Sequence, residues 1–243
     1  MTKLSFLNGN SLKLLGALFM VIDHIGVFLF PDVSILRYIG RLAFPIFAFM
    51  ISEGAKYTKN KTNYFLGICT LTLLCQYVVY FYDNKNLEMS SLVAFTLSIP
   101  IIYALQNLKR AIFEGDRHNK LSALWLFSTA ILLSYLFTRF FVVDYGFYGI
   151  LTPVFASIFD FRGISVPDKV KRLDRISLRV LSLGAALIML GASMNTRQFF
   201  ALFSLPLLLL YSEKRGKINM KYFFYVFYPL HILVLEGIAL IIS

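Results

Sequence analysis

The chain has 243 residues, of which 58% are hydrophobic and only 15% are charged, and its mean hydropathy is +0.70. Soluble domains are usually about 45–50% apolar and about 25% charged, so this composition excludes an ordinary soluble protein. Apolar segments of about 20 residues, the length that crosses the hydrocarbon core of a bilayer, recur along the whole chain. The sequence therefore predicts a multi-pass protein of the cell (cytoplasmic) membrane.

Hydropathy predicts an all-α fold of about nine transmembrane helices, which form a single domain over residues 1–243. The helices are expected at residues 11–30, 34–54, 62–82, 91–108, 120–139, 145–161, 176–193, 197–212 and 221–242. Polar, charged loops separate them. No internal repeat or low-complexity linker divides the chain.

The formal net charge is +11, because 24 Lys and Arg residues outnumber 13 Asp and Glu residues. These cations alternate from loop to loop: 19 fall on one side, and the five on the other are Arg37, Arg41, Lys85, Arg139 and Arg197. Cytoplasmic loops are enriched in Lys and Arg, so we expect a cytoplasmic N-terminus and an external C-terminus. The positive charge is thus a topology signal with some attraction to membrane lipids, and we expect no nucleic-acid partner.

The stretch Val21-Ile22-Asp23-His24-Ile25-Gly26 interrupts the first apolar segment with two ionisable residues. Such residues cost at least ~2.5–3.5 kcal/mol in the middle of a bilayer, so they usually face a bundle interior or a watery cavity. With a rise of about 1.5 Å per residue, both His24 and Arg41 lie roughly 9 Å below the external surface. We therefore expect Asp23, His24 and Arg41 to lie at one level.

A second polar pair, His231 and Glu236, lies in the last apolar segment. Prolines occur near both groups. Pro45 follows Arg41 by four residues and removes the helical donor to its carbonyl, which predicts a kink, and Pro229 removes another helical hydrogen bond just before His231. Freed carbonyls at membrane depth are tolerated where protein, water or ligand satisfies them, so the pattern predicts a central cavity.

Each of these residues also has a simpler structural interpretation. Asp23 and His24 are also suited to joining helices by hydrogen bonds, and Arg41 is suited to an ion pair with Asp23 or Glu236. Arg37 is placed to extend its charge to the outer surface. Two histidines, an aspartate and an arginine within one set of membrane helices are nevertheless hard to explain by packing alone.

Three motifs resemble the TraX family of integral membrane proteins: VIDHIG, the run IGRLAFPIFAFMISEG at residues 39–54, and FYPLHILVL at residues 227–235. The stretch DYGFYG at residues 144–149 fits the same family. The family is named after a protein that N-acetylates pilin, and it is similar to a wider group of multi-helix membrane acyltransferases. The residues on the family pattern are Asp23, His24, Arg41 and His231, with Glu53 and Asp144 also matching in less clear roles.

The resemblance implies an enzyme that moves an acyl group, most simply acetyl, from cytoplasmic acetyl-coenzyme A. The acceptor would be an amine or hydroxyl on an envelope glycan, a lipid or a pilin-like surface protein. His24 is the preferred general base and His231 the second candidate, because a neutral imidazole suits this role near pH 7.

Arg41 would stabilise the oxyanion or bind the pantetheine or phosphate part of the donor. Glu53 and Lys56, at the inner end of the second segment, are either boundary residues or part of the donor site. The basic inner loops, notably from Lys169 to Arg179, would attract the phosphates of the donor.

Two other classes of function use the same residues. A proton-coupled transporter or flippase would employ the buried Asp, His and Arg as a proton relay, although no inverted repeat is detectable. A non-catalytic assembly factor would need them only for packing. Cys69 and Cys75 occupy different sides of one helix, and no HExxH or CxxC motif occurs, so no metal site is expected.

Overall fold

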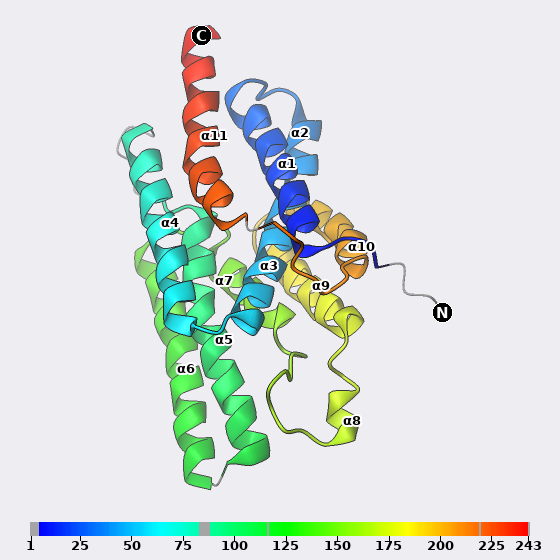
Figure 1. Cartoon of the computed structure of the whole chain (residues 1–243). Coiled ribbons are helices and arrows are strands. Elements are labelled where there is room, and N and C mark those ends of the chain that lie inside the picture. The colour runs from blue at the N-terminus through cyan, green and yellow to red at the C-terminus, as the bar shows by residue number, and fades with distance from the viewer. Residues whose placement is uncertain (1–4, 83–87, 116, 219, 243) are drawn as a thin grey trace.

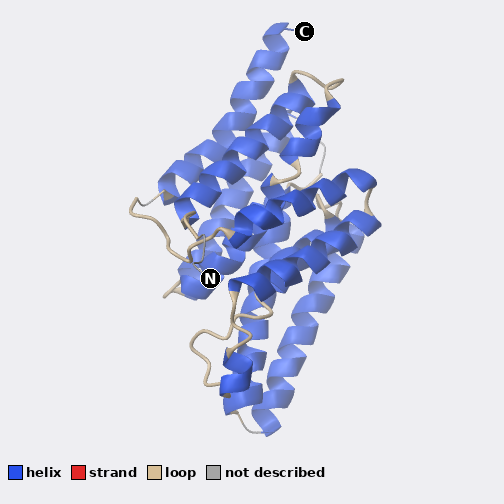
Figure 2. Ribbon diagram, turned by 90° about the vertical axis from the view of Figure 1, so that its right-hand side faces the viewer, coloured by secondary structure: helices blue, strands red, loops and turns tan. Residues whose placement is uncertain are grey.

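The computed structural model describes residues 5–82, 88–115, 117–218 and 220–242, which leaves the predicted external cation Lys85 outside the described ranges. Every regular element in these ranges is a helix (Figure 2). Strand-like pairing within them is limited to two isolated bridges, between Leu7 and Tyr211 and between Met89 and Val143. The predicted all-α class is confirmed.

The helices follow one another from the blue N-terminal to the red C-terminal end of the chain in Figure 1. Their bounds are α1 (Gly9–Phe28), α2 (Ser34–Gly40), α3 (Ala43–Tyr57), α4 (Lys61–Tyr82), α5 (Ser91–Glu114), α6 (Arg117–Phe140), α7 (Gly146–Ala156), α8 (Asp168–Lys171), α9 (Ile176–Ser193), the 3₁₀ helix η1 (Thr196–Ser204), α10 (Leu205–Leu209) and α11 (Lys221–Ile242).

Within the described ranges, seven helical segments are long and apolar enough to cross a membrane, counting α2 and α3 as one. They coincide with seven of the nine predicted segments. The other two are shorter than expected: residues 145–161 contain only the 11-residue α7, and residues 197–212 contain η1 followed by α10. Pro206 lies in the first turn of α10, where the missing backbone N–H of a proline costs no helical hydrogen bond.

α7 ends earlier than predicted because the carbonyls of two residues that follow it are bound by a side chain of α5. The Lys109 amine on α5 donates to the carbonyl oxygens of Ser157 at 2.7 Å and Asp160 at 2.9 Å. These contacts hold the chain in a turn and satisfy groups that would otherwise be buried without partners. The helix predicted to reach residue 161 therefore ends at Ala156.

The kink predicted at Pro45 is confirmed. α2 ends at Gly40, and α3 begins at Ala43 after the turn made by Arg41 and Leu42. The two helices together still form one 24-residue span. The break exposes the end of α2 to neighbouring side chains at membrane depth, where Arg41 lies.

α3 forms the centre of the bundle. Twelve of its 15 residues are buried, and it packs against α1, α5 and α7 (Figure 1). α6, by contrast, packs on α5 and α7 from the outside and buries only Ser134. α11 packs against α1 and α4, and its last turns extend beyond them at the top of Figure 1. The apolar outer faces of α6 and α11 suit contact with lipid.

A buried ion network ties α3 to the loops at the basic end of the bundle. Glu53 pairs with Arg179, whose side chain is fully buried on α9. One turn later, the Lys56 amine lies 3.7 Å from carboxylate oxygens of both Asp160 and Glu213. Removing one partner of a buried pair leaves an uncompensated charge, so these contacts fix the loops to the core.

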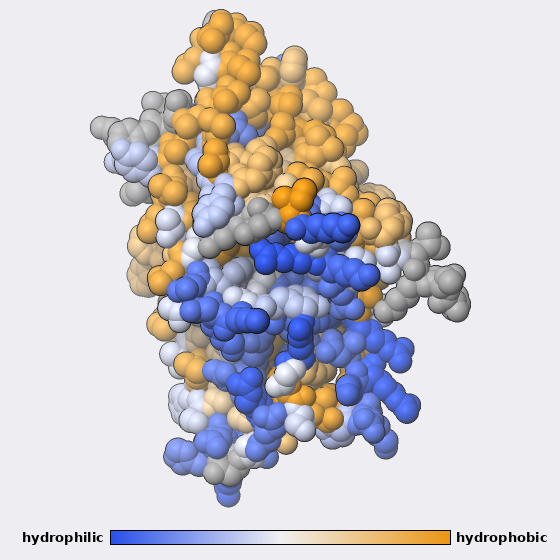
Figure 3. Space-filling view, viewed as in Figure 1, coloured by the Kyte–Doolittle hydropathy of each residue, from blue (hydrophilic) through white to orange (hydrophobic). Residues whose placement is uncertain are grey.

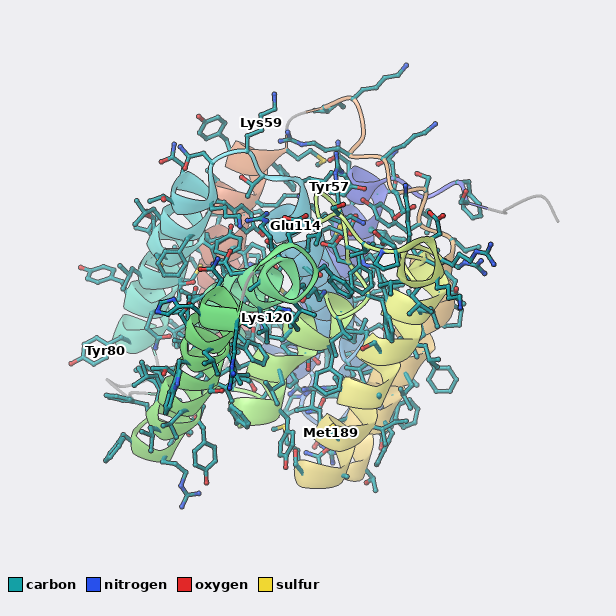
Figure 4. The ribbon with its side chains drawn as sticks, turned by 90° about the horizontal axis from the view of Figure 1, so that it is seen from below. Tyr57, Lys59, Tyr80, Glu114, Lys120 and Met189 are labelled. Carbon is teal, nitrogen blue, oxygen red and sulfur yellow. The ribbon has the colours of Figure 1, made fainter. Side chains whose placement is uncertain are left out.

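The face of the molecule in Figure 3 is divided into a hydrophilic and an apolar region. Hydrophilic residues gather over the middle and lower part of the face in Figure 3, and apolar residues cover its top. Seen from below, Tyr57 and Lys59 lie toward one edge of the molecule and Met189 toward the opposite edge (Figure 4). The predicted inner loop that carries Lys59 and the predicted outer half of α9 therefore lie toward opposite edges of the molecule.

The alternation of basic loops makes a testable prediction about orientation. In a background without Cys69 and Cys75, single cysteines at Lys59 and Lys171 should resist a membrane-impermeant thiol reagent in intact cells. A cysteine at Asp32, in the exposed turn before α2, should react. All three should react after permeabilisation. Labelling of the Lys171 position in intact cells would contradict the predicted orientation.

Candidate functional site

Asp23 is the anchor of a cluster that joins α1 to α2. Its Oδ2 lies 2.7 Å from Nη1 of Arg37 and its Oδ1 lies 3.4 Å from Nη2 of Arg41. The two arginines are four residues apart, so they lie on one face of the helix. The Asp23 side chain is 16% exposed and forms ion pairs with both guanidinium groups. The negative charge of Asp23, which would be costly in lipid, is therefore compensated within the protein.

Close packing of α1 on α2 depends on Gly40. A Cβ placed on this residue would overlap the Asp23 side chain, and the overlap includes Cβ of Asp23, so rotation of the carboxylate alone does not relieve it. Glycine is needed here for the close approach of a charged side chain to the backbone. The motif IGR thus encodes both the arginine and the space for its carboxylate partner.

Tyr145 brings a third element to the cluster. Its hydroxyl accepts a hydrogen bond from Nη1 of Arg41 at 3.2 Å, and its ring stacks on Phe44 with the centroids 3.9 Å apart. The residue adopts the left-handed conformation, with φ 64°, immediately before Gly146. Such strain in a non-glycine residue persists only where surrounding contacts hold it, and it often marks functional positions.

His24 and His231 join α1 to α11. Nδ1 of His24 lies 2.8 Å from Nε2 of His231, and Nδ1 of His231 lies 2.9 Å from the carbonyl oxygen of Phe227. The rings are nearly parallel, with an interplanar angle of 10°. The two histidines, 207 residues apart in the chain, thus form one hydrogen-bonded pair.

The hydrogen-bond partners decide where the protons lie when both rings are neutral. A carbonyl oxygen only accepts, so His231 must carry its proton on Nδ1 and donate it to Phe227. Its Nε2 is then an acceptor, and Nδ1 of His24 must donate to it. This leaves Nε2 of His24 with an unprotonated lone pair, the group that a general base requires.

Both histidines line a cavity of about 610 Å³, which we call the outer cavity. Its polar wall consists of Asp23, His24, Ser90, Ser91, Asp144, Tyr145, His231 and Glu236, and apolar residues of α1, α3, α4, α5 and α11 form the remainder. Asp144 lies in the turn before α7, where burial raises the pKa of its carboxyl to about 6. The outer cavity is therefore mostly apolar, with a few ionisable groups in its lining.

A second cavity of about 570 Å³, the inner cavity, begins at the basic end of the bundle. Its mouth is polar, and its depth is lined by apolar side chains of α3, α4, α5 and α11. Four residues line both cavities: Phe47, Leu92, Phe95 and Tyr228. The two cavities therefore adjoin at these side chains, near the middle of the bundle.

The structure brings together four of the residues predicted for the site, Asp23, His24, Arg41 and His231. Asp23, His24 and His231 line the outer cavity, whereas Arg41 lines neither cavity and contacts two residues of the outer one, Asp23 and Tyr145. Asp23 contacts the arginines and not His231, which leaves the histidines to orient each other.

Of the three residues predicted for donor binding, Arg41, Glu53 and Lys56, one lines the inner cavity. Glu53 lines the inner cavity, but its carboxylate is held by Arg179. Lys56 lies behind it in the ion network and lines neither cavity. Among the described residues, no group of three or more His, Cys, Asp or Glu side chains is arranged to hold a metal ion.

Arg37 and Tyr145 belong to the cluster around Asp23, although the sequence did not predict this. Arg37 was expected to extend to the outer surface, but it turns inward to Asp23. Its spacing of four residues from Arg41 was the available signal. For Tyr145 the signal was the following Gly146, because paired positive-φ residues form a sharp turn that points a side chain away from the helix path.

Comparison with known proteins gives the family. The family model described as "TraX protein" matches residues 8–239, so the chain belongs to the TraX family. It is also 29% identical over 136 residues to an uncharacterized protein of Rickettsia prowazekii (strain Madrid E), a match that covers 56% of this chain. The chain spans about half the length of that relative, 49%. No solved structure matches the chain.

The contact between Gly40 and Asp23 makes a prediction about stability. Gly40→Ala should lower the free energy of unfolding by about 1–3 kcal/mol, because the added methyl must displace the carboxylate. The matched control is Gly237→Ala on α11, where a Cβ meets no atom within 4 Å. Thermal unfolding in detergent measures both. Equal melting temperatures for the two variants would show that the close packing at Gly40 is not required.

Proposed function

We propose that this member of the TraX family is a membrane-embedded acyltransferase, most simply an acetyltransferase that uses acetyl-coenzyme A. The observation that carries the proposal is the hydrogen-bonded pair of His24 and His231 on the wall of the outer cavity. Their arrangement leaves a basic nitrogen in an apolar chamber beside groups that donate hydrogen bonds. General base catalysis of acyl transfer needs these features together.

In the proposed reaction, Nε2 of His24 accepts the proton of an acceptor amine or hydroxyl as that atom bonds to the thioester carbonyl carbon. The Nδ1 proton of His24 stays on its hydrogen bond to His231, which keeps the ring oriented as it becomes positively charged. When the carbon–sulfur bond breaks, His24 returns its proton to the leaving thiolate. The products are the acylated acceptor and free coenzyme A.

Tyr145 is placed to stabilise the negative charge that develops on the carbonyl oxygen. Its hydroxyl accepts from Arg41, which polarises the O–H group and leaves its own proton to donate into the outer cavity. Arg41 is a positioning residue in this account, because it acts through Tyr145 and is itself held by Asp23. A donor directed at the developing oxyanion is worth roughly 10²–10³ in rate.

The two adjoining cavities supply separate routes for donor and acceptor. An acyl donor from the cytoplasm would enter the inner cavity and pass its thioester between Phe47, Leu92, Phe95 and Tyr228. The acceptor, an envelope glycan, a lipid or a pilin-like surface protein, would occupy the outer cavity. The mostly apolar lining of both chambers excludes bulk water and so limits hydrolysis of the thioester.

The test measures acyl transfer in cells from which the gene is deleted and in the same cells complemented with the wild-type or a variant gene. Mass spectrometry of envelope glycans, lipids and surface proteins identifies the acylated product. His24→Gln should lower its amount by about 10²–10⁴-fold, because the side chain keeps polarity but loses the base. His118→Gln, on the exposed start of α6, is the matched control and should leave the product unchanged.

Expression and melting temperature of each variant separate loss of chemistry from loss of folding. If His231→Gln abolishes the product while His24→Gln retains it, the base is on α11. If the gene changes no acylated component, or His24→Gln acts like His118→Gln, the acyltransferase proposal fails and the proton-relay transporter is favoured.

A further inference from the structure

We propose that Lys13 and Arg215 form the phosphate-binding subsite for the coenzyme A part of the donor, at the mouth of the inner cavity. This inference rests on the proposed function and extends it to the opposite end of the bundle. Lys13 comes from the first turns of α1, and Arg215 from the loop that precedes α11. Both line the mouth of the cavity, together with Asn10, Asn60 and Asn63.

The charges at this mouth favour an anion. Two carboxylates also line the inner cavity, but Glu53 is bound by Arg179, and Glu213 lies 3.7 Å from the Lys56 amine. Lys13 has no ion-pair partner among the residues that the structure describes. It lies near enough to Arg215 for their like charges to repel, and a phosphate between them would remove that repulsion.

The loop that carries Arg215 is fixed to the start of α1. The backbone N–H of Gly9 donates to the carbonyl of Lys214 at 2.7 Å, and that of Asn10 to the carbonyl of Arg215 at 3.1 Å. The chain then turns away at Gly216, which has φ +95° and where a Cβ would lie 2.8 Å from the side-chain nitrogen Nδ2 of Asn10. The backbone of Arg215 is therefore held about one helical turn from Lys13, before any ligand binds.

The end of α1 does not itself provide the anion site. The N–H groups of Asn10 and Ser11 already donate to Oδ1 of Asn8 at 3.0 Å. The first amides of this helix are thus occupied by capping and by the loop contacts. Recognition of a phosphate must come from side chains, and the cations that line the mouth are Lys13 and Arg215.

The distance from this mouth to the proposed base is similar to the length of the donor's pantetheine arm. Lys13 and His24 lie on the same helix, 11 residues apart, which corresponds to roughly 16 Å along its axis. The pantetheine arm of coenzyme A is about as long as four extended peptide residues, roughly 14 Å, and the thioester and phosphate groups add to this length. A donor whose phosphates bind at Lys13 can therefore present its thioester near His24.

The subsite differs from the location that loop charge alone suggests. The stretch from Lys169 to Arg179 is strongly basic, but Arg179 is fully buried in its pair with Glu53. The remaining cations of this stretch do not line the inner cavity. Their charge is available to solvent and lipid headgroups, and it makes no pocket for the donor.

Calorimetry on the purified full chain tests the subsite with three probes: coenzyme A, dephospho-coenzyme A and pantetheine. Lys13→Gln and Arg215→Gln should each weaken coenzyme A binding by about tenfold to hundredfold, the range for a lost charge-assisted contact. Pantetheine lacks phosphate, so its affinity should not change. Added salt should weaken coenzyme A binding to the wild type more than to either variant.

The matched controls are Lys214→Gln and Lys217→Gln, which remove the same charge from the same loop at positions that do not line the cavity. They should bind coenzyme A as the wild type does. The subsite is wrong if folded Lys13→Gln and Arg215→Gln bind coenzyme A normally, or if the controls weaken binding equally, and the proposed function would survive either result. If the folded wild type binds none of the three probes, the proposed function fails as well.

Discussion

The ion pair between Asp23 and two arginines is the constraint from which the rest of the outer site follows. A carboxylate at this depth must be balanced within the protein, and Arg37 and Arg41 supply the charge from one helix face. Their guanidinium groups reach Asp23 only because Gly40 lets α1 and α2 approach closely. The break before Pro45 then places Arg41 at the end of α2, where its second nitrogen holds Tyr145.

With Asp23 committed to the arginines, the two histidines bind each other, and His231 also binds the backbone carbonyl of Phe227. This explains why adjacent residues in the motif VIDHIG serve different elements: Asp23 binds α2, and His24 binds α11. Successive helical residues point about 100° apart, so one helix can join both neighbours at the same level. The pairing fixes the tautomers and leaves one lone pair at the wall of the outer cavity.

Much of this arrangement could be predicted from the sequence. Helical rise gives depth, so Asp23, His24 and Arg41 were placed at one level, and Pro45 located the break in the second span. Sequence does not give the direction that each side chain faces around its helix, and for this reason Arg37 was expected at the surface. The pairing of Glu53 with Arg179 joins residues 126 positions apart and depends on how α3 and α9 pack, which hydropathy does not specify. The predicted segment 145–161 extends beyond α7 because apolar composition does not reveal that Lys109 binds the carbonyls of Ser157 and Asp160.

The proposed role of His24 as the base requires that His231 hold it with Nε2 of His24 unprotonated. The chain has three histidines, so ¹⁵N NMR of the His118→Gln variant reports only on this pair. We expect two neutral rings that both carry the proton on Nδ1, with one Nε2 accepting a hydrogen bond and the other free. A ring protonated on Nε2, or an imidazolium in the resting protein near pH 7, would contradict this expectation.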